Sequence, residues 1–598
     1  MVIPDNVTFI GSGAFADCLA LADVSIPVAV SYVGGGAFDN TFWFNELNDE
    51  SGFAIVGEGI LLKYTGTSTE VRIPGKVKRV NAAFKGCDHI TSVTIPDGVP
   101  AIENGTFFGC KKLTSVTIPE SVCSIGDSAF ENCSALETLT LPESVRSIGK
   151  AAFRNCQKLR SVNIPGGVQR LEEQCFYGCA ALDAIELPGN MTSIGTSAFA
   201  GCSELKIVAL PHKLRELEAY AFRGTPWYDS LFDPSGFVTV GEGVLIRYTG
   251  QAVDVSIPEG TSYIAAAFTD CISMRSVTVP DGVKTVGDLA FAGCSSLSSV
   301  SLPESVHAIG RAAFERCRSL TELSLPAGVS EMGNGVFANC SALKSLKLPR
   351  FLTTVGESCF SGCSGLTTIG LPDSLSSIGN AAFSGCSSLH AVTFPSGIRT
   401  IGDRAFFGCS SLNSIDIPMG LRSIGAAAFR DCLCLSLVNI PTSVLAVGAY
   451  AFDNTPWYAV LTEKDGLAVC GDGVLLKYTG ASAKVRVPQS IRYVSSAFHD
   501  LSFLVGVEFS SDVPVIESGA FANCPNLEKA TIPDGVVLIK SSAFANCPSL
   551  TSVVIPESVA VIEADAFANC KSLRSVSLPR SCRYDSAAFP KNCHIEFY

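Results

Sequence analysis

The sequence contains few charged residues and no cluster of basic ones. Only 17% of its 598 residues are charged, with 43 Lys and Arg against 56 Asp and Glu, so the net charge is −13. Nucleic-acid binding needs clustered Lys and Arg that displace counterions from phosphates. Anionic membrane surfaces likewise attract basic segments. The composition therefore predicts that the partner is not a nucleic acid and that the chain does not dock on anionic membranes.

The sequence also lacks a long apolar run. A membrane-spanning helix needs about 20 consecutive apolar residues, and the nearest candidate, Leu19 to Phe38, is interrupted by Asp23 and Pro27. The first residues, MVIPDNV, have neither the basic start nor the apolar core of a signal peptide, and the last, KNCHIEFY, carry no anchor signal. We expect no membrane insertion. Two interpretations stay open: either the protein is cytoplasmic, or this chain is a fragment of a longer gene product.

Motifs of catalysis are missing as well. There is no nucleophile elbow, phosphate-binding loop or HExxH motif, and the carboxylates are scattered or occupy turns after proline. We therefore predict that the chain is not an enzyme and has no catalytic residues, cofactor or metal ligands. The histidines lie in separate repeats without a recurring partner: His89, His212, His307, His390, His499 and His594.

Repetition is what the sequence has in abundance. A phenylalanine preceded by a small residue recurs at intervals of 23 residues, and three intervals of 46 residues each hide one modified repeat. In the stretch from Leu113 to Pro119, apolar residues alternate with Ser and Thr, which predicts a strand that the proline ends. A second, shorter strand is predicted at Val122 to Gly126. The segment from Ser128 to Cys133 is predicted to form one tight helical turn with its Phe and Cys facing inward.

A 23-residue unit cannot bury its own apolar face, but stacked units can. The pattern LxxVxIPxxVxxIGxxAFxxC resembles the BspA-like family of leucine-rich repeats over essentially the whole chain. The resemblance implies an α/β repeat fold: a leucine-rich-repeat solenoid of roughly 25 coils with a parallel sheet on the strand face and short helical turns or loops elsewhere. We expect residues 1–598 to form a single solenoid.

The same resemblance carries expectations about function. Members of the family are commonly surface proteins, and several are adhesins. It therefore implies a non-catalytic protein-binding solenoid at the cell surface or secreted, with an extracellular-matrix or other cell-surface protein as its ligand. The alternative is an intracellular leucine-rich-repeat scaffold or regulator in the cytoplasm.

The three longer intervals contain islands at about residues 39–66, 223–250 and 453–480. In each, apolar runs flank a Gly-acid-Gly triplet, which predicts a β-hairpin with a tight turn. Their aromatic residues are interpreted either as a contact patch for a partner or as plugs where the repeat loses its regular Cys and Leu. The candidates are Trp43, Tyr64, Trp227, Tyr228, Tyr248, Trp457, Tyr458 and Tyr478, and Thr41, Thr225 and Thr455 stand at the Cys position.

The chain has 25 cysteines, and 18 of them stand three residues after the repeated phenylalanine. One Cys per coil predicts a stacked ladder whose spacing of about 4.8 Å is longer than a disulfide prefers. A linear ladder also does not converge on a metal ion. Buried, reduced thiols are favoured, and some disulfides remain the alternative.

The residues that flank the buried Val of the longer strand are predicted to face outward. They are mostly Ser and Thr, which suit a solvent-facing strand, and a flat Ser/Thr ladder is also typical of ice-binding solenoids. Charged residues interrupt this polar surface, and we predict that they contribute to partner binding: Glu186, Lys347 and Asp416.

Overall fold

The computed structural model describes residues 1–47, 50–463, 465–510 and 513–598. The chain forms two compact units. Unit 1 comprises Met1–Gln251, Ile257–Phe268 and Gly282–Ala290, and unit 2 comprises Ala252–Ser256, Thr269–Asp281 and Phe291–Tyr598. Each unit is a stack of coils, and each coil contributes strands to two rows, which confirms the predicted solenoid.

The first row, here called the long-strand row, is built from the segment that ends at the repeated proline. In unit 1 its sheets have the orders β5-β7-β9, β11-β13 and β15-β17. The strands are β5 (Glu70–Arg72), β7 (Ser92–Thr94), β9 (Ser115–Thr117), β11 (Thr138–Leu139), β13 (Ser161–Val162), β15 (Ala184–Glu186) and β17 (Ile207–Ala209).

In unit 2 the long-strand row has the orders β21-β23-β25, β28-β30, β33-β35 and β39-β41-β43-β45-β47-β49. The strands are β21 (Asp254–Ser256), β23 (Ser276–Thr278), β25 (Ser299–Ser301), β28 (Ser345–Lys347), β30 (Thr368–Gly370), β33 (Ser414–Asp416), β35 (Leu437–Asn439), β39 (Lys484–Val487), β41 (Gly506–Phe509), β43 (Lys529–Thr531), β45 (Ser552–Val554), β47 (Ser575–Leu578) and β49 (His594–Phe597).

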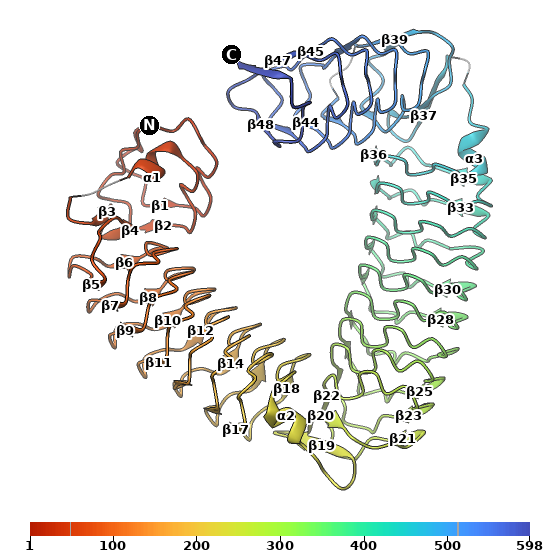
Figure 1. Cartoon of the computed structure of the whole chain (residues 1–598). Coiled ribbons are helices and arrows are strands. Elements are labelled where there is room, and N and C mark those ends of the chain that lie inside the picture. The colour runs from red at the N-terminus through yellow and green to blue at the C-terminus, as the bar shows by residue number, and fades with distance from the viewer. Residues whose placement is uncertain (48–49, 464, 511–512) are drawn as a thin grey trace. The chain divides into compact units, whose positions relative to one another are not determined.

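The second row, the short-strand row, consists of two-residue strands. In unit 1 these lie on the opposite side of the coils from the long-strand row (Figure 1). They are β1 (Phe9–Ile10), β2 (Tyr32–Val33), β6 (Arg79–Val80), β8 (Ala101–Ile102), β10 (Ser124–Ile125), β12 (Ser147–Ile148), β14 (Arg170–Leu171), β16 (Ser193–Ile194), β18 (Glu216–Leu217), β22 (Tyr263–Ile264) and β24 (Thr285–Val286).

Unit 2 continues the same pattern of short strands. They are β26 (Ala308–Ile309), β27 (Glu331–Met332), β29 (Thr354–Val355), β31 (Ser377–Ile378), β32 (Thr400–Ile401), β34 (Ser423–Ile424), β36 (Ala446–Val447), β40 (Tyr493–Val494), β42 (Val515–Ile516), β44 (Leu538–Ile539), β46 (Val561–Ile562) and β48 (Arg583–Tyr584).

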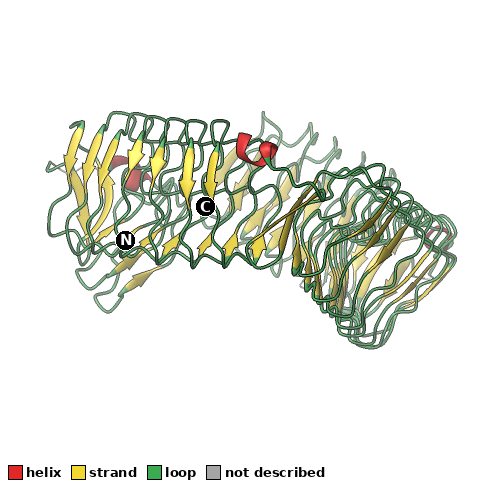
Figure 2. Ribbon diagram, turned by 90° about the horizontal axis from the view of Figure 1, so that it is seen from below, coloured by secondary structure: helices red, strands yellow, loops and turns green. Residues whose placement is uncertain are grey.

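The three predicted hairpins are confirmed. Each is antiparallel, and its second strand joins the short-strand row. A short helix precedes each hairpin, and these are the only helices of the described residues (Figure 2). The elements are α1 (Phe42–Glu46), β3 (Phe53–Val56) and β4 (Ile60–Tyr64); α2 (Pro226–Ser230), β19 (Phe237–Val240) and β20 (Val244–Tyr248); and α3 (Pro456–Ala459), β37 (Leu467–Cys470) and β38 (Val474–Tyr478).

Parallel register stacks equivalent residues of neighbouring coils. Val93 pairs with Val116, 23 residues later, and is buried between two outward-facing neighbours. The phenylalanine rings stack in the same way: the rings of Phe130 and Phe153 are fully buried, with centroids 5.3 Å apart and planes inclined by 8°. Burial of one such ring per coil is a hydrophobic contribution that a single unit could not provide.

The segment around the phenylalanine forms consecutive turns in place of a helical turn. Ser128 and Asn132, two residues before and two after Phe130, have positive φ values of 53° and 62°. Left-handed residues interrupt a helical turn, and they direct the N–H groups of Ser128, Phe130 and Asn132 to carbonyls of the next coil at 2.7–2.8 Å. These turns thus form a third line of hydrogen bonds between coils.

Candidate binding surface

The long-strand row presents an exposed polar surface in both units. Glu186 on β15, Lys347 on β28 and Asp416 on β33 are exposed and lie on this surface, each beside a buried aliphatic residue of its strand. Asp416 accepts a hydrogen bond from Asn439 Nδ2 in the next coil at 3.0 Å. The three residues lie on different strands, Glu186 in unit 1 and Lys347 and Asp416 in unit 2.

Glu186 lines a groove of about 500 Å³ in unit 1, where β11 and its partner β13 end after two residues. Here a side chain replaces the missing strand pairing. Asn163 accepts a hydrogen bond from the N–H of Leu141 at 2.7 Å and donates one to the carbonyl of Leu141 at 2.8 Å. The backbone of Leu141 is therefore paired although its strand has ended.

Lys347 lines a second groove, of about 570 Å³, in unit 2. It lies beside the segment from Glu322 to Leu325, which would be a strand in a regular coil but has no strand or bridge in the structure. Arg350 also lines this groove, and its guanidinium lies 4.7 Å from the ring centroid of Phe351. The groove combines apolar leucines with charged side chains.

The island tryptophans end the stacks of phenylalanine rings. Trp227 packs on Phe222 with ring centroids 4.7 Å apart and planes inclined by 58°. Trp43 and Trp457 pack in the same edge-on manner on Phe38 and Phe452, at 4.9 Å each. All three tryptophans are half-buried. This geometry supports the interpretation as plugs, while partner binding by these rings stays a prediction.

The island tyrosines begin the next stack. Tyr64, Tyr248 and Tyr478 pack on the following repeat's phenylalanine with centroids 5.2, 5.1 and 5.7 Å apart. Tyr64 and Tyr478 donate hydrogen bonds to the carbonyls of Ser68 and Ser482, each at 3.3 Å. Each island thus closes one ring stack and opens the next.

The helices explain why threonine replaces cysteine in the islands. Thr225 is fully buried, donates to the Phe222 carbonyl at 2.8 Å and accepts from the Tyr228 N–H at 3.2 Å, so it caps the N-terminus of α2. Thr41 and Thr455 cap α1 and α3 in the same way. The sequence Thr-Pro in two of the islands is the signal for this role, because proline is favoured at the first helical position.

A basic side chain from the hairpin stabilises the other end of each helix. Lys477 Nζ donates to the carbonyl of Tyr458 at 2.9 Å and lies 4.8 Å from the ring centroid of Tyr458. The same contact is made by Arg247 on Tyr228 and by Lys63 on Phe44. The hydroxyls of Tyr228 and Tyr458 donate to the carbonyls of Ile246 and Leu476. The polar groups of these two tyrosines are therefore paired within their islands.

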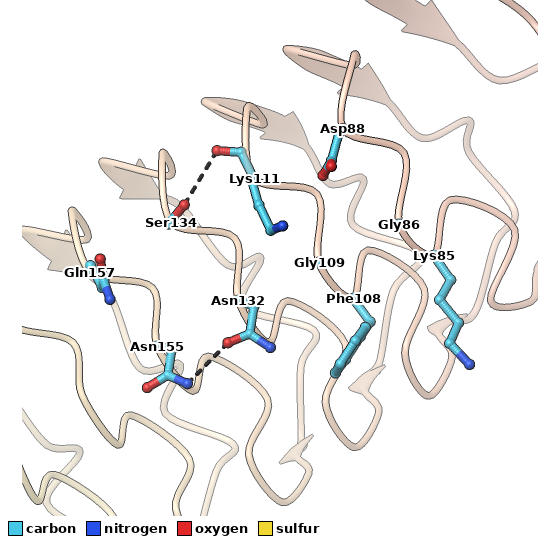
Figure 3. A pocket seen from close by; sticks show the side chains of 10 residues that line it. All are labelled: Lys85, Gly86, Asp88, Phe108, Gly109, Lys111, Asn132, Ser134, Asn155 and Gln157. Atoms are coloured by element: carbon cyan, nitrogen blue, oxygen red, sulfur yellow. Dashed lines mark hydrogen bonds between the residues drawn. The ribbon is translucent and has the colours of Figure 1, made fainter.

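A groove that the sequence did not indicate lies on the turn side of unit 1 (Figure 3). Asn155 Nδ2 donates to Asn132 Oδ1 at 3.0 Å, which links two neighbouring coils. At the equivalent places in the two preceding coils stand Gly86 and Gly109, which have no side chain to continue this line. The groove is further lined by Lys85, Asp88, Phe108, Lys111, Ser134 and Gln157.

Most of the regular cysteines are buried, whereas Cys18, Cys87 and Cys271 are half-buried. Cys133 Sγ donates to the carbonyl of Phe107 in the preceding coil at 3.1 Å, and Cys156 Sγ does so to Phe130 at the same distance. Burial raises the pKa of Cys202 to about 12, so its thiolate is suppressed. Within the described chain, no group of three or more His, Cys, Asp or Glu residues is placed to hold a metal ion.

With this geometry established, the family can be stated. A sequence model of the BspA type leucine-rich repeat region matches six times, over residues 1–82, 77–182, 124–249, 246–367, 330–459 and 476–596. The chain therefore belongs to the BspA-type leucine-rich-repeat family, as its repeat motif predicted. No helix in the described residues is long and apolar enough to span the bilayer.

Several solved structures are similar to this chain. A leucine-rich repeat protein from Bacteroides ovatus is 28% identical, with 68% of this chain and 90% of that one covered and a TM-score of 0.31. A leucine-rich cell surface protein from Faecalibacterium prausnitzii is 27% identical, with coverages of 54% and 94% and a TM-score of 0.32. The pneumococcal vaccine antigen PcpA is 22% identical, with coverages of 59% and 89% and a TM-score of 0.31. A comparison with curated proteins gave no significant match.

Proposed function

We propose that this chain is a non-catalytic protein-binding solenoid that acts at a cell surface or outside the cell, as an adhesin does. The observation that supports the proposal is the long-strand row. Its outward side chains repeat in register from coil to coil, and its two grooves are lined by Glu186 and Lys347. A repeating, solvated surface of this kind offers many weak contacts over a large area, which suits a protein ligand.

Most repeated residues of the regular coils have structural roles. Their Phe, Cys, Leu and Val side chains are buried, and the repeated turns bond to the neighbouring coil. A partner therefore meets the outward residues of the strand rows and the places where the repeat is interrupted. Membership of the BspA-type family agrees with this role, because extended concave or flat repeat surfaces are the parts that such proteins use for binding.

The test is a binding screen with the intact chain. Purified chain is immobilised and presented with extracellular-matrix proteins and, separately, with an extract of the cells that produce it. We expect capture of a matrix or cell-surface protein, and weaker capture by Glu186→Lys. Capture only of cytoplasmic proteins would favour the intracellular scaffold, and labelling of the chain on unbroken cells would oppose that alternative.

A further inference from the structure

Each island interrupts the line of hydrogen bonds that the turns form between neighbouring coils. The repeated phenylalanines on its two sides stand 46 residues apart, because the coil between them has no turn segment of this kind. At the third island, side chains bridge the gap. Ser496 Oγ accepts a hydrogen bond from the Tyr450 N–H at 2.7 Å. Ser495 Oγ donates one to the Gly448 carbonyl at 3.0 Å, so the coil before the island is tied directly to the coil after it.

An acid and a base cross the same gap at the positions that directly follow the two phenylalanines. In the third island these are Asp453 and His499, whose Oδ1 and Nε2 lie 3.8 Å apart. In the first island they are Asp39 and Lys85, whose Oδ2 and Nζ lie 3.7 Å apart. Histidine is the side chain that changes charge between about pH 5 and 8, whereas lysine stays protonated over this range. The same bridge is therefore charged throughout in the first island and titratable in the third.

His499 lies between two carboxylates. Its Nδ1 is 2.9 Å from Asp500 Oδ2, while its Nε2 faces Asp453. The imidazole also packs edge-on against the Tyr450 ring, with centroids 5.1 Å apart and planes inclined by 77°. A neutral imidazole has one N–H and can donate to only one of the carboxylates, whereas the protonated ring donates from both nitrogens. Protonation therefore gives His499 a donor for each carboxylate.

The pair of Asp453 and His499 is largely removed from solvent, with side chains 15% and 16% exposed. Burial raises the pKa of Asp453, and the positive charges of His499 and Arg430 act to lower it. A neighbouring cation stabilises a buried carboxylate. The pair therefore contributes stability when His499 is charged, and this contribution is lost as the pH rises through the range in which histidine titrates. Among the described residues, the other charged or titratable groups around the pair are Asp431 of the preceding coil, Tyr450, Tyr458 of α3, Lys477 of β38 and Asp500.

We propose that His499 is a pH-sensitive latch across the third island. In its protonated form it bonds both Asp453 and Asp500 and holds the coil before the island against the coil after it. In its neutral form it releases Asp453, so the two coils separate more readily at neutral pH than in mild acid. The first island, where Lys85 takes the place of the histidine, is held equally in both conditions. The latch goes beyond the proposed binding function and does not depend on the identity of a partner.

Three equivalent backbone amides allow the islands to be measured separately. The Tyr478 N–H donates to the carbonyl of Ala497, in the coil after the third island, at 2.8 Å. The N–H groups of Tyr64 and Tyr248 make the same bond after the first and second islands. Deuterium exchange of the full chain, followed by mass spectrometry and corrected for the intrinsic exchange rate, measures how often each of these bonds opens.

Between about pH 6 and pH 8 we expect the protection of the Tyr478 amide to fall roughly threefold or more. Protection of the Tyr64 amide should be constant, because Lys85 keeps its charge over this range. Protection in the second island should also be constant, because Arg223 and Thr269 stand at the two positions and form no acid–base pair. An equal fall in all three islands would mean a general effect of pH on the coils and would overturn the proposal.

Two substitutions separate the charge from the structure. His499→Lys supplies a cation that does not titrate in this range, so the Tyr478 amide should keep its acid-state protection at the higher pH. Asp453→Asn removes the partner without leaving a buried charge, so protection should stay at the lower level at both pH values. Circular dichroism checks that both variants are folded. His390→Lys, which changes an exposed histidine of another coil, is the matched control and should leave the pH dependence intact. Wild-type pH dependence of the Tyr478 amide in either of the first two variants would show that this pair is not the latch.

Discussion

Regular coils and islands solve the same packing problem differently. In a regular coil a buried phenylalanine stacks between two others, and a cysteine thiol bonds the preceding coil. In an island the stack ends edge-on at a tryptophan, a threonine replaces the cysteine, and a hairpin starts the next stack with a tyrosine. The comparison shows that the island aromatics are components of the core as well as of the surface.

The two regions also differ in how their polar groups are satisfied. Regular coils bond mainly to their neighbours 23 residues away, whereas the islands form local bonds between helix and hairpin, such as Lys477 to Tyr458. The islands add these local bonds to those they keep with neighbouring coils, such as the bond from the Trp227 N–H to the Leu205 carbonyl at 2.8 Å. In a linear repeat array, stability is the sum of such units and the interfaces between them. The following changes separate the two contributions.

Phe153→Ala should produce the largest loss of stability. The ring is fully buried between Phe130 and Phe176, and removing a buried phenyl ring costs about 3–5 kcal/mol because it leaves a cavity. Urea unfolding followed by circular dichroism measures the loss. Phe153→Leu is the control, with a smaller expected loss. A loss below about 1 kcal/mol for the alanine variant would contradict the role of the stack.

Trp227→Ala together with Trp457→Ala tests the two interpretations of the islands. Both rings are half-buried, so we expect each change to cost about 2 kcal/mol, less than a buried phenylalanine. If the rings are plugs, the stability falls while capture of the protein partner persists. Loss of capture at full stability would show instead that the tryptophans form the contact patch. Trp→Phe at both positions is the control that retains a ring.

The sequence predicted the elements that repetition encodes. The 23-residue period, the strand that ends at proline and the Gly-acid-Gly hairpins correspond to observed elements, because stacked identical units leave one consistent arrangement. The repeated glycine that follows the short strand, as at Gly126, has no positive φ, and Glu occupies the same place in other coils.

Other features could not be predicted from the sequence, because they depend on the distances between neighbouring coils. A Cβ on Gly126 would lie 2.5 Å from Asn104 Oδ1, so close approach of the neighbouring coil favours glycine there. The turn around Phe130 was predicted as helical because its left-handed residues, such as Ser128, are not glycine. The interruption at Glu322 to Leu325 was missed for a different reason: its residues still alternate as those of a strand do.

Thr225→Ala should have a smaller effect, confined to the second island. The hydroxyl caps α2 and donates to the Phe222 carbonyl, and loss of a capping group costs about 1 kcal/mol. Thr225→Ser retains the hydroxyl and should retain most of the stability. The same pair of changes at Thr41 and Thr455 should give similar values, measured by urea unfolding. Equal losses for alanine and serine would show that the methyl group, and not the cap, stabilises the island.

Thiol labelling should distinguish the exposed cysteines from the buried cysteines of the regular coils without changing stability. Cys123 and Cys434 are exposed, while most of the regular cysteines, such as Cys202, are buried, and burial raises the pKa of Cys202 to about 12. In the native chain at pH 8 under reducing conditions, iodoacetamide should modify Cys123 and Cys434 first, because the thiolate is the reactive form. The buried thiols should react only after unfolding in urea, as peptide mass spectrometry would show. Labelling of Cys202 in the native chain at the rate of Cys123 would mean that the coils open locally, and that the hydrogen bond from Cys202 to Phe176 does not hold the stack closed.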